Sequence, residues 1–315
     1  MKGMRLLVRL ILITAFVTAG FAQEAPPIVP APVAPSEPAA VPAMDLRPDA
    51  SGTVPQEQIR ELLRRVAEKD LENEKRLRDY TYIQRQEEHK LDGHGEIKKV
   101  ESRTSEVLVV YGEHIERLIA KDDKPLSTED TKKEDERIQK ITDKRKNESE
   151  SDRRKRIEKD EKDREDGRKF VLEIADAYNF RLAGSELVDG RDTWILDAEP
   201  RPAYKPTYRE AKMLPKIHGR IWIDKAETQW TKFDITTTDT ISFGLFLARV
   251  HKGTHIVVEA TRVNEEVWLP KHLSLHVDVR VALLKNFNED IEQTFRDYKK
   301  FRTDTKFTVV GETSQ

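Results

Sequence analysis

The clearest pattern in the chain is a strict alternation of apolar and polar residues between positions 272 and 283. Its apolar members are Leu273, Leu275, Val277, Val279, Val281 and Leu283. Because successive side chains of a β-strand point to opposite faces, this period of two predicts a strand with one buried face and one wet face. Weaker alternation at 217–224 and 254–263, with turn signals between the runs, predicts an antiparallel sheet of about eleven strands. One of these strands is expected at 243–251.

Two segments follow a helical period instead. Between residues 56 and 78, apolar residues recur at intervals of three and four, from Ile59 through Val66 to Leu71. This spacing predicts an amphipathic helix. A second apolar stripe predicts another helix at 168–178. Both helices are available to cover the apolar face of the sheet as its lining or lid.

The segment 127–169 is dominated by charge, because 31 of its 43 residues are charged and the two signs are nearly balanced. Opposite charges three and four positions apart favour a solvated helix. One or two protruding helices are therefore expected, with disorder as the alternative because large apolar residues are scarce. The balance of charge argues against nucleic-acid binding by the basic cluster at 153–156.

The first 22 residues have the features of a secretory signal peptide. Lys2, Arg5 and Arg9 precede an apolar run at 10–17, and cleavage is expected after about Ala22. An uncleaved membrane anchor is the alternative, although the run is roughly half of the ~20 residues that a spanning helix needs. The expected location is therefore the periplasm, with association to the outer membrane left open.

The rest of the chain divides by composition. Residues 23–55 hold nine of the fifteen prolines, which predicts an extended linker, or less simply a ligand for a proline-binding domain. A folded domain is expected at 56–308, with the charged segment 127–169 as an insertion in it. Residues 309–315 are expected to form a C-terminal tail.

Composition and motifs exclude several kinds of chemistry. The chain is 37% hydrophobic and 36% charged, with a mean hydropathy of -0.71, so it is not a multi-span membrane protein. Its net charge of -2 gives no general attraction for nucleic acid, and the absence of cysteine removes disulfides, thiol nucleophiles and cysteine-ligated metals. Gly184-Ser185-Glu186 lacks the second glycine of a nucleophile elbow. No catalytic residue and no cofactor are predicted.

Histidines supply one candidate metal site. His251 and His255 flank a glycine turn and could face each other across a hairpin. A metal needs several converging ligands, however, and only aspartate or glutamate could complete the set here. Ordinary polar surface is therefore the preferred interpretation, and no metal is predicted.

Three short sequences carry a resemblance to a known family. They are GRIWID at 219–224, EVWLPK at 266–271 and FRDYKKF at 295–301. Together with the predicted elements, they resemble the lipoprotein carrier (LolA/LolB-like) superfamily, and in particular envelope proteins grouped as outer membrane lipoprotein-sorting-like. The resemblance covers about residues 56–308 and departs from the family at the charged segment. No functional residue of the family can be assigned to a position here.

The resemblance implies an α+β fold: a strongly curved antiparallel sheet, or half-open β-barrel, with a helical lid and the charged helical insertion. In that family the half-barrel shelters acyl chains or another apolar group. The residues expected on its apolar inner wall are Ile221, Ile223, Phe233, Ile235, Ile256, Val258, Leu275, Val277 and Val279.

This reading predicts a non-enzymatic carrier of lipid or lipoprotein acyl chains. The alternative is an interaction or sensor module for an envelope protein partner, built on the same fold with a filled core. A packed barrel would favour that alternative.

Overall fold

A computed structural model describes residues 44–111, 113–243, 248–281 and 285–300. The expected signal peptide, most of the linker and the expected C-terminal tail lie outside these ranges. No helix within them is long and apolar enough to cross a membrane.

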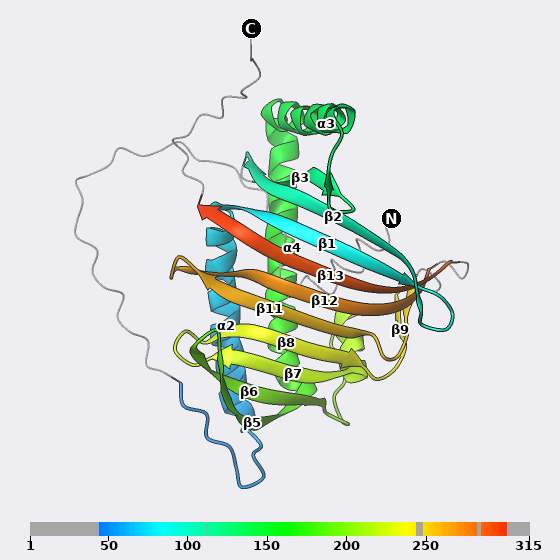
Figure 1. Ribbon diagram of the computed structural model, residues 1–315. Helices are drawn as coiled ribbons and strands as arrows, with labels where there is room; N and C mark the ends of the chain where they lie inside the picture. The colour runs from blue at the N-terminus through cyan, green and yellow to red at the C-terminus, as the bar shows by residue number, and fades with distance from the viewer. Residues whose placement is uncertain (1–43, 112, 244–247, 282–284, 301–315) are drawn as a thin grey trace, which may run out of the picture.

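The strands form one curved antiparallel sheet that is not closed into a barrel (Figure 1). They are β1 (Tyr80–Leu91), β2 (Ile97–Val110), β3 (Glu113–Lys121), β4 (Lys124–Pro125), β5 (Tyr178–Val188), β6 (Arg191–Pro200), β7 (Ile217–Asp224), β8 (Gln229–Thr237), β9 (Ile241–Phe243), β10 (Ala248–Val250), β11 (His255–Val263), β12 (Val267–Val281) and β13 (Lys285–Lys300). Their order is β4-β3-β2-β1-β13-β12-β11-β8-β7-β6-β5, and β10 joins β9 to β12.

The alternating run lies in β12 as far as Val281, and its apolar residues from Leu273 to Val279 are buried. Leu283 lies outside the described residues. The single strand expected at 243–251 was wrong. Phe243 pairs with Ala248 in antiparallel register, so two short strands, β9 and β10, stand where one was expected. An apolar run alone does not show where one strand ends and the next begins, because two paired strands can both be apolar.

Within the described residues, three α-helices and one 3-10 helix accompany the sheet: α2 (Gln56–Leu77), α3 (Thr128–Lys146), α4 (Glu150–Ala177) and η1 (Glu210–Lys216). The helices α2 and α4 both run across the strands behind the sheet in Figure 1. The α+β class and the helical insertion expected from the sequence are therefore confirmed. The helix expected at 168–178 is not separate, because it is the C-terminal end of α4.

The charged segment docks through polar contacts rather than through an apolar face. Glu134 of α3 accepts a hydrogen bond at 2.8 Å from the backbone N–H of Leu118 in β3, and Arg137 donates to the carbonyl of Glu116. These side chains satisfy backbone groups on the outer edge of β3, where the two-residue strand β4 pairs only with Ala120 and Lys121. At the opposite edge, Val54 donates its N–H to Phe180 of β5 at 2.9 Å.

The junction between α3 and α4 is held by four charged groups. Arg145 and Arg156 each contact both Glu113 and Glu148, at 2.8–3.2 Å. All four side chains are largely shielded from solvent, so these ion pairs are screened less than exposed ones. Charge pairs thus position the first turns of α4 beside β3.

Both α3 and α4 begin with the same capping motif, Ser-x-x-Asp. In α4, Ser149 Oγ accepts the N–H of Asp152 at 3.1 Å and donates to its carboxylate at 2.8 Å. Ser127 and Asp130 repeat the arrangement in α3. Each motif satisfies a backbone donor that the first turn of a helix leaves unpaired.

Replacing Ser149 with Ala should lower the free energy of unfolding by about 1 kcal/mol, because the N–H of Asp152 loses its partner. Denaturant titration followed by circular dichroism measures the change. The control is Ser151→Ala, which removes a hydroxyl two positions later without removing a cap. Equal stability of the two variants would contradict the assigned role of Ser149.

Candidate functional site

The nine expected wall residues come together on four neighbouring strands, β7, β8, β11 and β12. Cross-strand pairs place them on one face: Ile221 lies opposite Phe233, and Ile256 lies between Ile235 and Leu275. All nine belong to or pack against a single hydrophobic cluster. Their grouping defines one continuous apolar surface on the inner side of the sheet.

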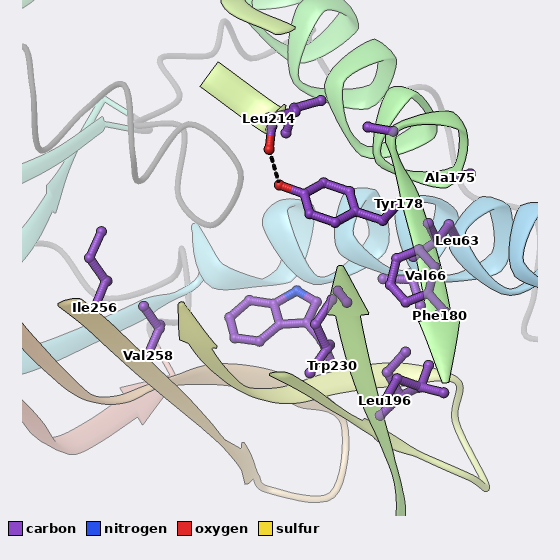
Figure 2. Packing of buried hydrophobic residues seen from close by; sticks show 14 of the residues in the cluster. Leu63, Val66, Ala175, Tyr178, Phe180, Leu196, Leu214, Trp230, Ile256 and Val258 are labelled. Atoms are coloured by element: carbon purple, nitrogen blue, oxygen red, sulfur yellow. Dashed lines mark hydrogen bonds between the residues drawn. The ribbon is translucent and has the colours of Figure 1, made fainter. Parts of the chain in front are cut away.

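The helices α2 and α4 cover this surface. The buried residues Ile59, Leu62, Leu63 and Val66 of α2 and Ala175 of α4 belong to the same cluster as the wall. Figure 2 shows Leu63 and Val66 on one side of the cluster and Ile256 and Val258 on the sheet. Seven of the nine wall side chains expose 8% or less of their surface. The wall is therefore filled by the helices rather than open.

A small apolar pocket remains beside η1. It has a volume of about 30 Å³ and is lined by Met213, Ile217, Ile235, Thr236, Thr237, Ile241, Val250, Thr254 and Ile256. This volume suits about one water-sized group, whereas ligand pockets are typically about 300–1,000 Å³. Two wall residues, Ile235 and Ile256, line it. An acyl chain would have to displace part of the covering layer to extend from this pocket along the wall.

The covering layer is fastened at the η1 end by tyrosine hydroxyls. Tyr178, at the start of β5, donates to the carbonyl of Leu214 in η1 at 2.7 Å (Figure 2). Burial raises the pKa of the Tyr178 hydroxyl, so it stays a neutral donor. Tyr204 donates to the Glu173 carboxylate of α4 at 2.5 Å. These bonds tie the loop that carries η1 to α4 and β5.

At the other end, a polar network fastens α2 to the sheet. Asp70 of α2 accepts hydrogen bonds from Gln229 Nε2 at 2.6 Å and from Trp230 Nε1 at 2.8 Å. Asn73 donates to Gln229 Oε1 at 2.9 Å and accepts the backbone N–H of Trp268 at 3.1 Å. Side chains of one helical turn thus connect α2 with both β8 and β12.

The Asp70 carboxyl group is strongly perturbed. Burial raises its pKa to about 7, although its hydrogen bonds with Gln229 and Trp230 favour the charged form, and the charge of Glu74 raises the pKa further. Sequence reasoning missed this residue. A signal was present, because Asp70 and Asn73 continue the apolar stripe that contains Val66, and polar side chains on a buried stripe need partners.

A second charged group lies beside this network, at the β7–β8 turn. Asp224 is 1% exposed and accepts two hydrogen bonds from the Arg191 guanidinium, at 2.7 and 3.0 Å. The guanidinium also stands 5.3 Å from the centre of the Trp268 ring. Glu227 accepts from Trp268 Nε1 at 2.7 Å. The ion pair between Arg191 and Asp224 therefore joins β6 to the turn, and Trp268 connects β12 to both Arg191 and Glu227.

The histidines of the expected metal candidate have separate partners. His251 Nδ1 lies 3.1 Å from Asp278, and His255 Nε2 lies 2.7 Å from Asp234. Within the part of the chain that the structure describes, no three ligating side chains form a group that could hold a metal ion. The two imidazoles are therefore held by different carboxylates of the sheet surface.

Comparison with known proteins gives structural neighbours only. No family profile and no curated protein sequence matches the chain. Among solved structures, it is similar to a LolA superfamily protein from Nitrosomonas europaea, with 9% identity, a TM-score of 0.30 and coverage of 78% of this chain and 93% of the other. It is also similar to an outer membrane lipoprotein-sorting protein domain from Vibrio parahaemolyticus, with 12% identity, a TM-score of 0.30 and coverage of 78% and 95%.

A third neighbour is a complex of MucA and MucB from Pseudomonas aeruginosa, with 8% identity, a TM-score of 0.21 and coverage of 78% and 99%. The first two neighbours bear the family names that the sequence motifs resemble. At these identities and scores, the comparisons do not bear on ligand or partner.

Proposed function

We propose that the protein binds an apolar group without chemical conversion, and that this group is an acyl chain of a lipid or lipoprotein in the periplasm. The observation that carries the proposal is the continuous apolar surface of β7, β8, β11 and β12, with the pocket beside η1 at one end. An apolar surface this long needs a permanent or an exchangeable cover. In this protein the cover consists of α2 and the end of α4.

Loading requires the cover to move. An acyl chain enters beside η1 and takes the place of α2 side chains along the wall. Burial stabilises the chain by about 0.8 kcal/mol for each CH₂ group, and this gain offsets the loss of burial of the displaced α2 side chains. The polar network around Asp70 holds α2 closed when no ligand is present. Each contact in this network is a hydrogen bond, either between two side chains or between a side chain and a backbone N–H. The network can therefore open and re-form without breaking a covalent bond.

The packed interior favours a second candidate. In this alternative, the core stays filled and the fold serves as an interaction module for an envelope protein, with the linker and the charged helices as contact surfaces. The small volume of the pocket supports it. Neither candidate involves nucleic acid or a cofactor.

Native mass spectrometry of residues 23–315, purified from a host that exports them, separates the two candidates. Lipid that co-purifies near a one-to-one ratio and appears on organic extraction supports the carrier and identifies the class of its cargo. A protein mass without ligand, together with no uptake of added fatty acid, supports the interaction module.

A cysteine pair tests the movement of α2. The chain has no cysteine, and Asn73 and Gln229 hydrogen-bond across α2 and β8, so Asn73→Cys with Gln229→Cys places one thiol on each element, and a bismaleimide cross-linker that joins the two thiols keeps α2 closed. The cross-linked protein is expected to take up fluorescent fatty acid at least about tenfold more slowly than the same variant without the cross-linker. As a control, Ser274→Cys with Glu292→Cys is cross-linked between β12 and β13 at paired positions. Equal uptake with and without the cross-link between α2 and β8 would contradict a moving α2.

A further inference from the structure

The residues on the inner face of the sheet change from apolar to mostly polar between β12 and β13. Inward residues of β12 are apolar, from Leu273 to Val279, and Leu275 lies opposite Ile291 of β13. The neighbouring inward positions on β13, β1 and β2 are mostly polar. Glu88 lies opposite Ile291 on one side and Glu101 on the other. Directly opposite residues of antiparallel strands share a face, so these carboxylates point to the same side as the apolar wall.

The polar inner strip contains both signs of charge. Its charged members are Glu88 and Lys90 of β1, Lys99, Glu101 and Arg103 of β2, and Glu289 of β13. Glu289 is 5% exposed and sits between Val277 and Lys90, at the boundary with the apolar wall. Most of the strip keeps some exposed surface, and Arg103 is exposed. Water therefore reaches the inner face here, in contrast to the filled apolar half.

Two members of the strip lack an ionic partner. Lys90 and Lys99 both pair with Glu101. Glu88 accepts a hydrogen bond from the amide of Gln86 at 2.7 Å. Within the described ranges, neither Glu88 nor Arg103 forms an ion pair, although they lie on one face at diagonal positions of β1 and β2. Diagonal neighbours are about 7–8 Å apart, a distance that a head group with two charges can bridge.

Building on the proposed function, we infer that the ligand is an amphiphile with a zwitterionic head group, an ammonium and a phosphate next to an acyl chain. The acyl chain lies on the wall at Leu275 and Val277, and the head group lies on the polar strip. There Glu88 receives the ammonium and Arg103 receives the phosphate. An anionic head group without the ammonium would bring no positive charge to Glu88 and would place a second negative charge near it, which disfavours such a ligand.

The test compares three ligands that share one sixteen-carbon chain: palmitoyl lysophosphatidylethanolamine, palmitoyl lysophosphatidylglycerol and hexadecanol. Competition against a fluorescent fatty acid measures each affinity in the wild type, in Glu88→Gln and in Arg103→Gln. The wild type should bind the ethanolamine lipid about tenfold more tightly than the glycerol lipid, the size of one charge-assisted hydrogen bond. Glu88→Gln should remove that preference, and Arg103→Gln should weaken both phospholipids about tenfold.

Hexadecanol, which has no charge, should bind all three proteins equally and so reports whether the wall is intact. Matched controls are Glu87→Gln and Arg85→Gln, which change the same residue types on the outer face of β1, where Arg85 pairs with Glu87 and Asp123. Uptake of no ligand by the wild type overturns the proposed function itself. Uptake of all three without preference, or a preference that Glu88→Gln leaves unchanged, overturns only the zwitterionic head group. Thermal melting of each variant confirms that it is folded.

Discussion

The Asp70→Asn protein is expected to be more stable than the wild type by about 2–4 kcal/mol at pH 8.5 and by only about 0.5 kcal/mol at pH 4. Burial raises the pKa of Asp70 in the folded protein to about 7, from an ordinary value of 3.8. Asparagine has no charge to bury, and its Oδ1 can accept the same hydrogen bonds from Gln229 and Trp230. The gain is therefore the removal of a cost that the wild type carries above neutral pH.

The pH window follows from this upward shift. Well below pH 3.8, Asp70 is protonated in both the folded and the unfolded chain, so it adds no pH dependence, and at pH 4 only a small part of the cost is present. Between about pH 4 and pH 7 the unfolded chain loses the proton while the folded chain keeps it, so the free energy of unfolding falls as pH rises. Above pH 7 the full cost is present.

Thermal melting from pH 4 to 8.5 measures the effect, with Asp70→Asn less dependent on pH than the wild type. Glu72→Gln, an exposed position on the same helix, serves as the control and should follow the wild type. Parallel curves for the wild type and Asp70→Asn would show that the carboxyl group of Asp70 is not perturbed. If α2 is the moving cover, the same ionisation loosens it as pH rises.

Replacing Arg191 with Met should lower the free energy of unfolding by about 3–5 kcal/mol. The arginine supplies the bidentate partner of Asp224, whose side chain is 1% exposed, and it also contacts Glu227 at 3.1 Å. Methionine keeps much of the apolar stem beside Trp268 but leaves a buried carboxylate without its counter-charge. Denaturant titration at pH 7.5 measures the loss.

The double variant Arg191→Met with Asp224→Asn separates charge from packing. Asparagine removes the negative charge and can still accept the N–H of Glu227, which Asp224 accepts at 2.7 Å. Most of the lost stability should return in the double variant. A double variant as unstable as Arg191→Met alone would show that packing against Trp268, rather than the buried charge, is the larger contribution.

Local patterns were enough to predict most of the strands and helices. The alternation at 272–283 indicates which residues face the core and which face solvent. The strand β12 and the orientation of its residues could therefore be predicted from the sequence. The apolar stripe from Ile59 to Val66 likewise located α2. The length of α4 was missed because its charged first half and apolar last quarter look like two elements. The Ser-x-x-Asp motif at 149–152 marks its start and could have joined them.

The state of the wall could not be predicted in the same way. Alternation shows which side chains face inward, but it does not show whether α2 and α4 fill the space in front of them. That outcome depends on contacts between distant residues, such as Asp70 with Trp230 and Glu173 with Tyr204. Nothing in a local window relates these partners. The polar strip could not be predicted for a similar reason, because Glu88 and Arg103 become neighbours only through the pairing of β1 with β2.

The contacts at the two edges of the sheet affect whether copies of this chain can associate strand to strand. A sheet that is not closed offers unpaired backbone at both borders, and such borders allow copies to join strand to strand into fibres. Here Glu134 and Arg137 occupy backbone groups of β3, and the segment before α2 occupies backbone groups of β5 at Phe180 and Leu182. Side chains on one border and a neighbouring stretch of the same chain on the other thus protect the protein against polymerisation.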